Sequence, residues 1–183
     1  MANSGTIHNS LSPLVDELLS AVRGDIFWES YLKPLQLLES PTFRLHLAIL
    51  VEPYLQFILD GKKTVESRFS TRKFAPYNRV EKDDVVLLKQ SSGPIVGICQ
   101  VSYVWFYQLE PESWQTIKEG FATAICAQDP DFWKQREAAS FATLMRIQNV
   151  KSIEPIKFVK RDRRGWVVLY ETSSQLQLDL GIP

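Results

Sequence analysis

Apolar and polar residues alternate along residues 42–51, the pattern of a strand whose two faces meet different surroundings. The first face is formed by Phe43, Leu45, Leu47, Ile49 and Val51, and the second by Thr42, Arg44, His46 and Ala48. We therefore expect the first strand of a sheet here, with His46 on its polar face.

A short helical pattern from Tyr54 to Asp60 follows and stops at Gly61. Glycine at this point suits the left-handed residue that commonly ends a helix. Beyond it the pattern changes to one of alternation, which predicts a second strand that the chain enters at Lys63. Side chains two positions apart share one face of a strand, so Glu66 and Arg68 should lie side by side.

The rest of the chain mixes short strands with helices. Residues 85–88 and 95–106 read as strands, residues 110–121 as a helix, and residues 129–148 as a further helix that includes Phe141, Leu144 and Met145. Two later strands, 152–160 and 166–170, are joined by a polar turn ending in Gly165, which predicts a hairpin. The pattern alone therefore indicates an α+β fold.

Two apolar stripes at helical spacing precede the first strand. We expect residues 1–41 to form an N-terminal helical extension, residues 42–173 the main domain, and residues 174–183 a tail. The helices could cover one end of the sheet, or they could bind a protein partner, and their sequence leaves both alternatives open.

Bulk composition narrows the range of functions. The 183 residues include 21 basic and 21 acidic side chains, so any anion must be bound by a local patch rather than by the overall charge. The two cysteines and two histidines are well separated, so we expect no disulfide framework, metal site or cofactor. No stretch has the length of a membrane span, and no signal peptide is visible, which favours a cytoplasmic protein with no membrane partner.

The strongest chemical signal is the cluster of Lys63, Glu66 and Arg68 after the turn at Gly61. A lysine removed from water has a lowered pKa and can act as a base or nucleophile, and a nearby glutamate can orient it. Arginine offers a planar fork of donors for a carbonyl, phosphate or carboxylate. The alternative is structural: a Glu66–Arg68 pair that stabilises the strand beside a solvated Lys63.

The spacing Gly61-x-Lys63-x-x-Glu66-x-Arg68 after a short helix resembles the signature of the ASCH domain, a relative of the RNA-binding PUA domain. The resemblance covers residues 42–171. It implies a PUA-like small β-barrel with inserted helices, and a cleft in which Gly61, Lys63 and Arg68 contact RNA, a nucleoside or a nucleotide.

One branch of this family is similar to small bacterial amidohydrolases that remove the acetyl group from N4-acetylcytidine. That resemblance implies catalysis by the motif lysine, a threonine three residues later and a more distant glutamate. Lys63 matches the lysine, Glu66 stands where the threonine is expected, and Glu119 is the nearest candidate for the distant glutamate. The missing hydroxyl argues against this particular activity.

A second group of candidates is basic. Arg72 and Lys73 follow the motif strand, and the expected hairpin carries Lys157, Lys160, Arg161, Arg163 and Arg164. Such residues can contact a phosphate backbone, with Trp166 or Tyr170 available for stacking. The alternative is a solvated turn that discourages edge pairing.

Three hypotheses follow from the sequence: a domain that binds RNA or a nucleotide, a hydrolase using the same cleft (an amidohydrolase or a ribonuclease), and a protein-interaction adaptor. The first predicts that Lys63, Glu66 and Arg68 line one polar cleft with aromatic walls. It also predicts that replacing Lys63 or Arg68 weakens binding and changes stability little.

Overall fold

The computed structural model describes residues 4–37, 41–159 and 163–171. Their helices and strands follow in this order: α1 (Ser4–Ala21), α2 (Ile26–Gln36), β1 (Leu45–Leu50), α3 (Tyr54–Leu59), β2 (Val65–Ser70), β3 (Val85–Gln90), β4 (Ile95–Gln108), α4 (Pro111–Phe121), α5 (Pro130–Lys134), β5 (Phe141–Ile156) and β6 (Trp166–Tyr170).

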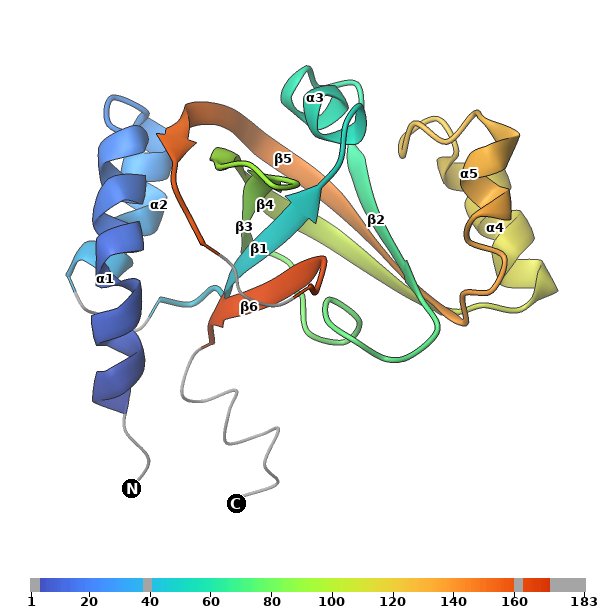
Figure 1. Ribbon diagram of the computed structural model, residues 1–183, viewed down its shortest axis with the longest axis horizontal. Helices are drawn as coiled ribbons and strands as arrows, with labels where there is room; N and C mark the ends of the chain where they lie inside the picture. The colour runs from blue at the N-terminus through green and yellow to red at the C-terminus, as the bar shows by residue number, and fades with distance from the viewer. Residues whose placement is uncertain (1–3, 38–40, 160–162, 172–183) are drawn as a thin grey trace.

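The strands form one six-stranded sheet in the order β2-β5-β4-β3-β1-β6. β1 and β3 run parallel, and the other neighbouring pairs are antiparallel. The sheet curls into a half-barrel, with α1 and α2 at one side and α4 and α5 at the other (Figure 1). The predicted α+β fold is confirmed. β2 and β6 are the two edges of the sheet, and the opening between them holds the candidate site.

The first strand lies where the sequence predicted it, but both of its faces are buried. Leu45 and Leu47 pack in a cluster with α1 and α2, whereas Ala48 and Leu50 pack in the cluster inside the curl. The prediction of a polar face that carries His46 is therefore wrong, because this residue is fully buried. The ring nitrogens of His46 have partners that are distant in the chain, and the alternation of residues along one strand cannot reveal such partners.

The helix expected through residue 148 is wrong in its second half, where the chain forms strand β5. α5 ends at Lys134, and β5 then pairs with β2 on one side and β4 on the other. Ala142 and Leu144 pack beneath α4 and α5, whereas Met145 packs inside the curl. Because both faces of β5 are buried, its apolar residues do not alternate with polar ones, and their spacing imitates that of a helix.

The expected hairpin is also wrong. The first of its two strands is part of β5, which is central in the sheet, and β6 pairs instead with β1 at the far edge. β5 and β6, which are consecutive in the sequence, are thus separated by three other strands in the sheet. Gly165 still precedes a strand, but it serves a contact across the opening rather than a tight turn.

The two predicted N-terminal helices cover the outer face of the sheet. Leu18, Trp28 and Leu32 are buried in the same cluster as Leu45. The indole Nε1 of Trp28 donates to the carbonyl of Asn149 at 3.0 Å, which ties α2 to β5. These helices therefore bury much of their apolar stripe within the chain itself. A protein partner on their outer side stays a prediction, and so do the proposed domain boundaries.

In the part of the chain that the structure describes, no helix combines the length and apolar character that a membrane crossing requires. The tail from residue 174 lies outside the described residues.

Candidate functional site

The turn after α3 places the motif lysine at the start of β2. Gly61 has a φ of +72°, the left-handed conformation predicted from the sequence. The backbone N–H groups of Lys62 and Lys63 both donate to the carbonyl of Phe57 at 2.9 Å. This closes the helix end tightly and directs Lys63 inward, while Gly61 itself is exposed.

Lys63 is buried, with a side chain 3% exposed. Its Nζ donates to the carbonyls of Val65 at 2.7 Å and Ile125 at 3.3 Å, and it lies 3.3 Å from Oε2 of Glu66. An ammonium group has three N–H donors, so these three acceptors match its full capacity. Burial lowers the pKa of Lys63, and the opposing charge of Glu66 only partly offsets this.

Glu66 joins Lys63 to Arg68. Burial alone would raise the pKa of Glu66, but the charges of Lys63 and Arg68 outweigh it and hold that pKa below its ordinary value. Arg68 Nε lies 2.8 Å from Oε1 of Glu66 without an aligned hydrogen bond, so this contact is an ion pair. The three side chains form one continuous chain of charges with a net charge of +1.

Arg68 spans the opening of the half-barrel. From the edge strand β2, its Nη1 donates to the carbonyl of Gly165 and its Nη2 to that of Ile49, both at 3.1 Å. The guanidinium carbon lies 5.3 Å from the ring centroid of Trp166, which is a cation–π distance. The side chain of Arg68 thus links β2 to β1 and to the start of β6. In the sheet itself, β2 pairs with neither of these strands.

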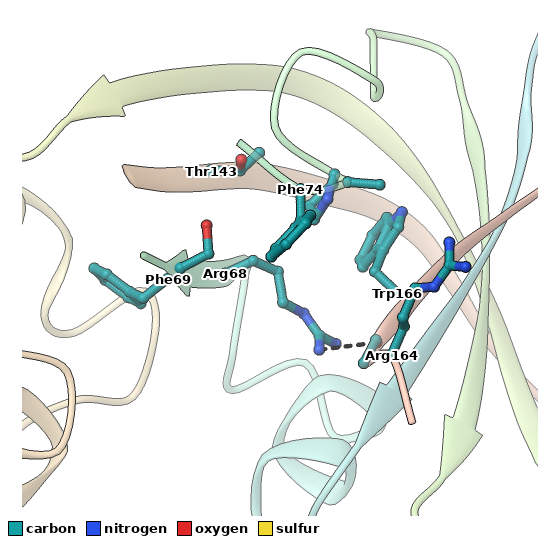
Figure 2. A pocket seen from close by; sticks show the side chains of 10 residues that line it. Arg68, Phe69, Phe74, Thr143, Arg164 and Trp166 are labelled. Atoms are coloured by element: carbon teal, nitrogen blue, oxygen red, sulfur yellow. Dashed lines mark hydrogen bonds between the residues drawn. The ribbon is translucent and has the colours of Figure 1, made fainter. Parts of the chain in front are cut away.

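A pocket of about 670 Å³ lies in this opening (Figure 2). Its walls come from β2, the loop after β2, β5 and the start of β6. The lining residues are Arg68, Phe69, Ser70, Phe74, Ala75, Pro76, Thr143, Arg164, Gly165 and Trp166. Of the motif trio, Arg68 is among them, and Lys63 and Glu66 are not. The structure therefore brings the three together but presents only Arg68 at this pocket.

A buried polar chain supports Trp166. Its indole Nε1 donates to Nδ1 of His46 at 3.2 Å, and Nε2 of His46 lies 2.9 Å from Oδ2 of Asp84. An indole nitrogen can only donate, so Nδ1 of His46 accepts and its Nε2 carries the proton toward Asp84. Sequence reasoning missed this role for His46 and Asp84.

Phe74 is a pocket residue that sequence reasoning missed. Its side chain is 61% exposed, in the polar loop between β2 and β3. A single apolar side chain at the surface is common in proteins, so the sequence around Phe74 gave no specific signal for this role.

The remaining sequence candidates are dispersed. Glu119 lies on the exposed side of α4, where its Oε1 accepts from Gln115 Nε2 at 2.8 Å. Arg72, Lys73, Lys157, Arg163 and Arg164 are exposed, and Arg164 lines the pocket. Lys160 and Arg161 lie outside the described residues. Among the described residues, no three His, Cys, Asp or Glu side chains gather as a metal site requires.

Comparison with solved structures identifies similar folds. The ASCH protein from Zymomonas mobilis aligns with a TM-score of 0.55 and 13% sequence identity, over 76% of this chain and 95% of that chain. A mutant of the same protein, in which one serine is replaced by alanine, aligns with a TM-score of 0.56 and 14% identity, over 75% of this chain and 96% of that one. At such identities the likeness shows the fold alone.

A search of curated proteins finds no match. The family model of the ASCH domain matches residues 49–161, which include the motif strand, the loop that carries Phe74 and all of β5. This match spans more than half of the chain, and ASCH domains are associated with RNA binding. The chain belongs to the ASCH domain family.

Proposed function

We propose that this protein binds RNA and takes up one nucleotide in the pocket at the opening of the half-barrel. The observation that carries the proposal is the position of Arg68. Its guanidinium is held in place by hydrogen bonds and lies in a pocket that Phe74 and Trp166 also line. The pocket's volume of about 670 Å³ falls within the range of about 300–1,000 Å³ typical of small-ligand sites.

Arg68 is suited to a neutral planar group. Its bonds to Gly165 and Ile49 use one N–H of each Nη, so each Nη keeps a second N–H that can face a ligand. Glu66 offsets part of the guanidinium charge, although it also pairs with Lys63, and this favours the use of Arg68 as a fork of hydrogen-bond donors. The acceptor edge of a nucleobase fits such a fork.

The aromatic residues supply the other half of base recognition. Trp166 is held by His46 and is 3% exposed, whereas Phe74 is 61% exposed and projects from a loop. A base stacked on the exposed ring of Phe74 would gain about 1–3 kcal/mol, and the buried Trp166 forms a fixed wall beside it. Arg164, on the rim of the same pocket, supports a contact to the phosphate that the base carries.

Hydrolysis by the motif residues is the second candidate, because burial lowers the pKa of Lys63 as a catalytic base would require. However, the donors of Lys63 are matched by three protein acceptors, and Glu119 lies on the exposed side of α4. RNA binding therefore explains more of the arrangement of these residues than hydrolysis does. Chromatography of RNA and of N4-acetylcytidine after incubation with the protein tests the hydrolase alternative.

Calorimetric titration with the four ribonucleoside monophosphates and a single-stranded RNA hexamer tests the proposal. Phe74→Ala removes an exposed pocket ring and should weaken binding at least about fivefold, the lower end of the stacking range. Tyr103→Ala is the matched control, since Tyr103 is 52% exposed and does not line the pocket. No binding by the native protein, or equal losses in the two variants, would refute the proposal.

A further inference from the structure

A second group of aromatic side chains adjoins the pocket. Tyr77 lies with its ring centroid 5.5 Å from that of Phe106 and 5.1 Å from that of Phe141. Lys73 adds a charge, because its Nζ lies 5.5 Å from the centroid of the Phe141 ring. We call Lys73, Tyr77, Phe106 and Phe141 the Tyr77 cluster.

The cluster lies on the same face of the sheet as Arg68. In the ladders, Thr143 is the partner of both Arg68 and Phe106, so these three residues form one row across β2, β5 and β4. Phe141 lies two residues before Thr143 on β5 and pairs with Ser70, another pocket residue. Residues paired across strands point to one face, so the row continues the pocket floor.

The loop between β2 and β3 links the two places directly. Phe74 lines the pocket, and its carbonyl accepts from the backbone N–H of Tyr77 at 2.9 Å. One short segment thus presents an aromatic ring to the pocket and another to the cluster. A ligand that leaves the pocket along this loop meets the cluster next.

The cluster is open to solvent and positively charged at its edge. Phe106 is 38% exposed, Tyr77 and Phe141 are half-buried, and Lys73 and Arg72 are exposed. Aromatic rings beside a cation form the usual combination that binds single-stranded nucleic acid without regard to sequence. Rings that served only to anchor the loop would not need exposed lysine and arginine beside them.

We propose that the Tyr77 cluster is a second stacking site, which takes the nucleotide next to the one in the pocket. The ligand is therefore a single-stranded RNA segment of at least two nucleotides rather than a free nucleotide. This inference rests on the proposed function, since it presupposes a nucleotide in the pocket. Lys73 contacts the phosphate between the two nucleotides.

Comparing ligands of different length tests the inference. The probes are uridine monophosphate and a single-stranded hexauridylate, titrated against the native protein, Phe106→Ala and Tyr103→Ala. Tyr103 and Phe106 are both exposed aromatic residues of β4. The native protein should bind the hexamer at least about tenfold more tightly than the monophosphate. Phe106→Ala should reduce hexamer affinity at least about fivefold and leave monophosphate affinity unchanged.

The outcomes separate the two proposals. Equal affinity of the native protein for monophosphate and hexamer overturns the second stacking site and leaves the pocket intact. The second site is likewise overturned if Phe106→Ala weakens both ligands equally, or if Tyr103→Ala weakens the hexamer as much. Failure of both ligands to bind the native protein overturns the proposed function itself. Circular dichroism melting curves ensure that the variants are compared as folded proteins.

Discussion

Arg68 and Gly165 face each other across the opening of the half-barrel, 97 residues apart in sequence and joined by a 3.1 Å hydrogen bond. A Cβ atom placed on Gly165 would lie 3.2 Å from Nη1 of Arg68. The absence of a side chain at this position therefore lets the guanidinium approach the carbonyl closely. This contact fixes the donors of Arg68 at the pocket without a strand ladder between β2 and β6.

Gly165→Ala should displace the tip of Arg68 by a few tenths of an ångström. We expect weaker nucleotide binding, by about 1–3 kcal/mol if one hydrogen bond of the charged guanidinium is lost, and a small change in melting temperature. Calorimetry and thermal denaturation measure the two effects. Gly120→Ala in α4 is the control, since a Cβ there meets nothing within 4 Å. Unchanged binding in Gly165→Ala would show that Arg68 adjusts freely.

Glu66→Gln should destabilise the protein strongly. The Glu66 side chain is 7% exposed and that of Lys63 is 3% exposed, so the change leaves a buried ammonium group without its counter-charge. Breaking a buried ion pair in this way costs about 3–5 kcal/mol. Denaturant titration measures the loss. For the same reason, the sequence-based expectation that Lys63 contributes little to stability needs revision, and a fully stable Glu66→Gln variant would contradict this role of the ion pair.

Acid should remove the same contribution from the native protein. The pKa of Glu66 in the folded chain lies below its ordinary value of 4.5, because the charges of Lys63 and Arg68 outweigh burial. Its stabilisation is thus present above the unfolded pKa and is lost as the pH falls through the lower folded pKa. Melting temperatures between pH 7 and pH 3 should fall more steeply for the native protein than for Glu66→Gln. Parallel curves would contradict the assigned direction of the shift.

Arg164 should determine part of the salt dependence of RNA binding. If it contacts a phosphate, Arg164→Gln should reduce the slope of log K against log salt by about 0.7, the value for one contact to a single strand. Lys62→Gln is a matched loss of charge, because Lys62 has a side chain 64% exposed and pairs with Asp60 away from the pocket. Equal slopes in the native protein and Arg164→Gln would exclude the phosphate contact.

Local sequence patterns predicted the parts of the site that are local in the fold. Gly61, Lys63, Glu66 and Arg68 fall within a few residues, and the end of a helix followed by strand alternation was enough to place them together. The same rules failed for β5, because a strand buried on both faces loses the alternation that identifies it. The hairpin prediction failed for a related reason. Turn residues indicate that the chain changes direction, but they do not indicate which strand the following strand pairs with.

The pocket itself could not be predicted from the sequence. Arg68 meets Gly165 and Trp166 only because the sheet curls until its two edge strands approach each other. His46 was assigned to a polar face, and its true surroundings depend on Asp84 and Trp166, which are distant in the chain. Long-range contacts of this kind leave no periodic signal in the sequence.

Photocrosslinking would show whether an RNA nucleotide occupies the opening between β2 and β6. A single-stranded RNA that carries 4-thiouridine is irradiated on the native protein, and the crosslinked peptides are identified by mass spectrometry. We expect crosslinks in the segments 68–76 and 164–166, which contain all the pocket-lining residues except Thr143, and their loss on competition with unmodified RNA. Crosslinks confined to α1, α2 or the exposed side of α4, with none at the pocket, would contradict RNA binding in this opening.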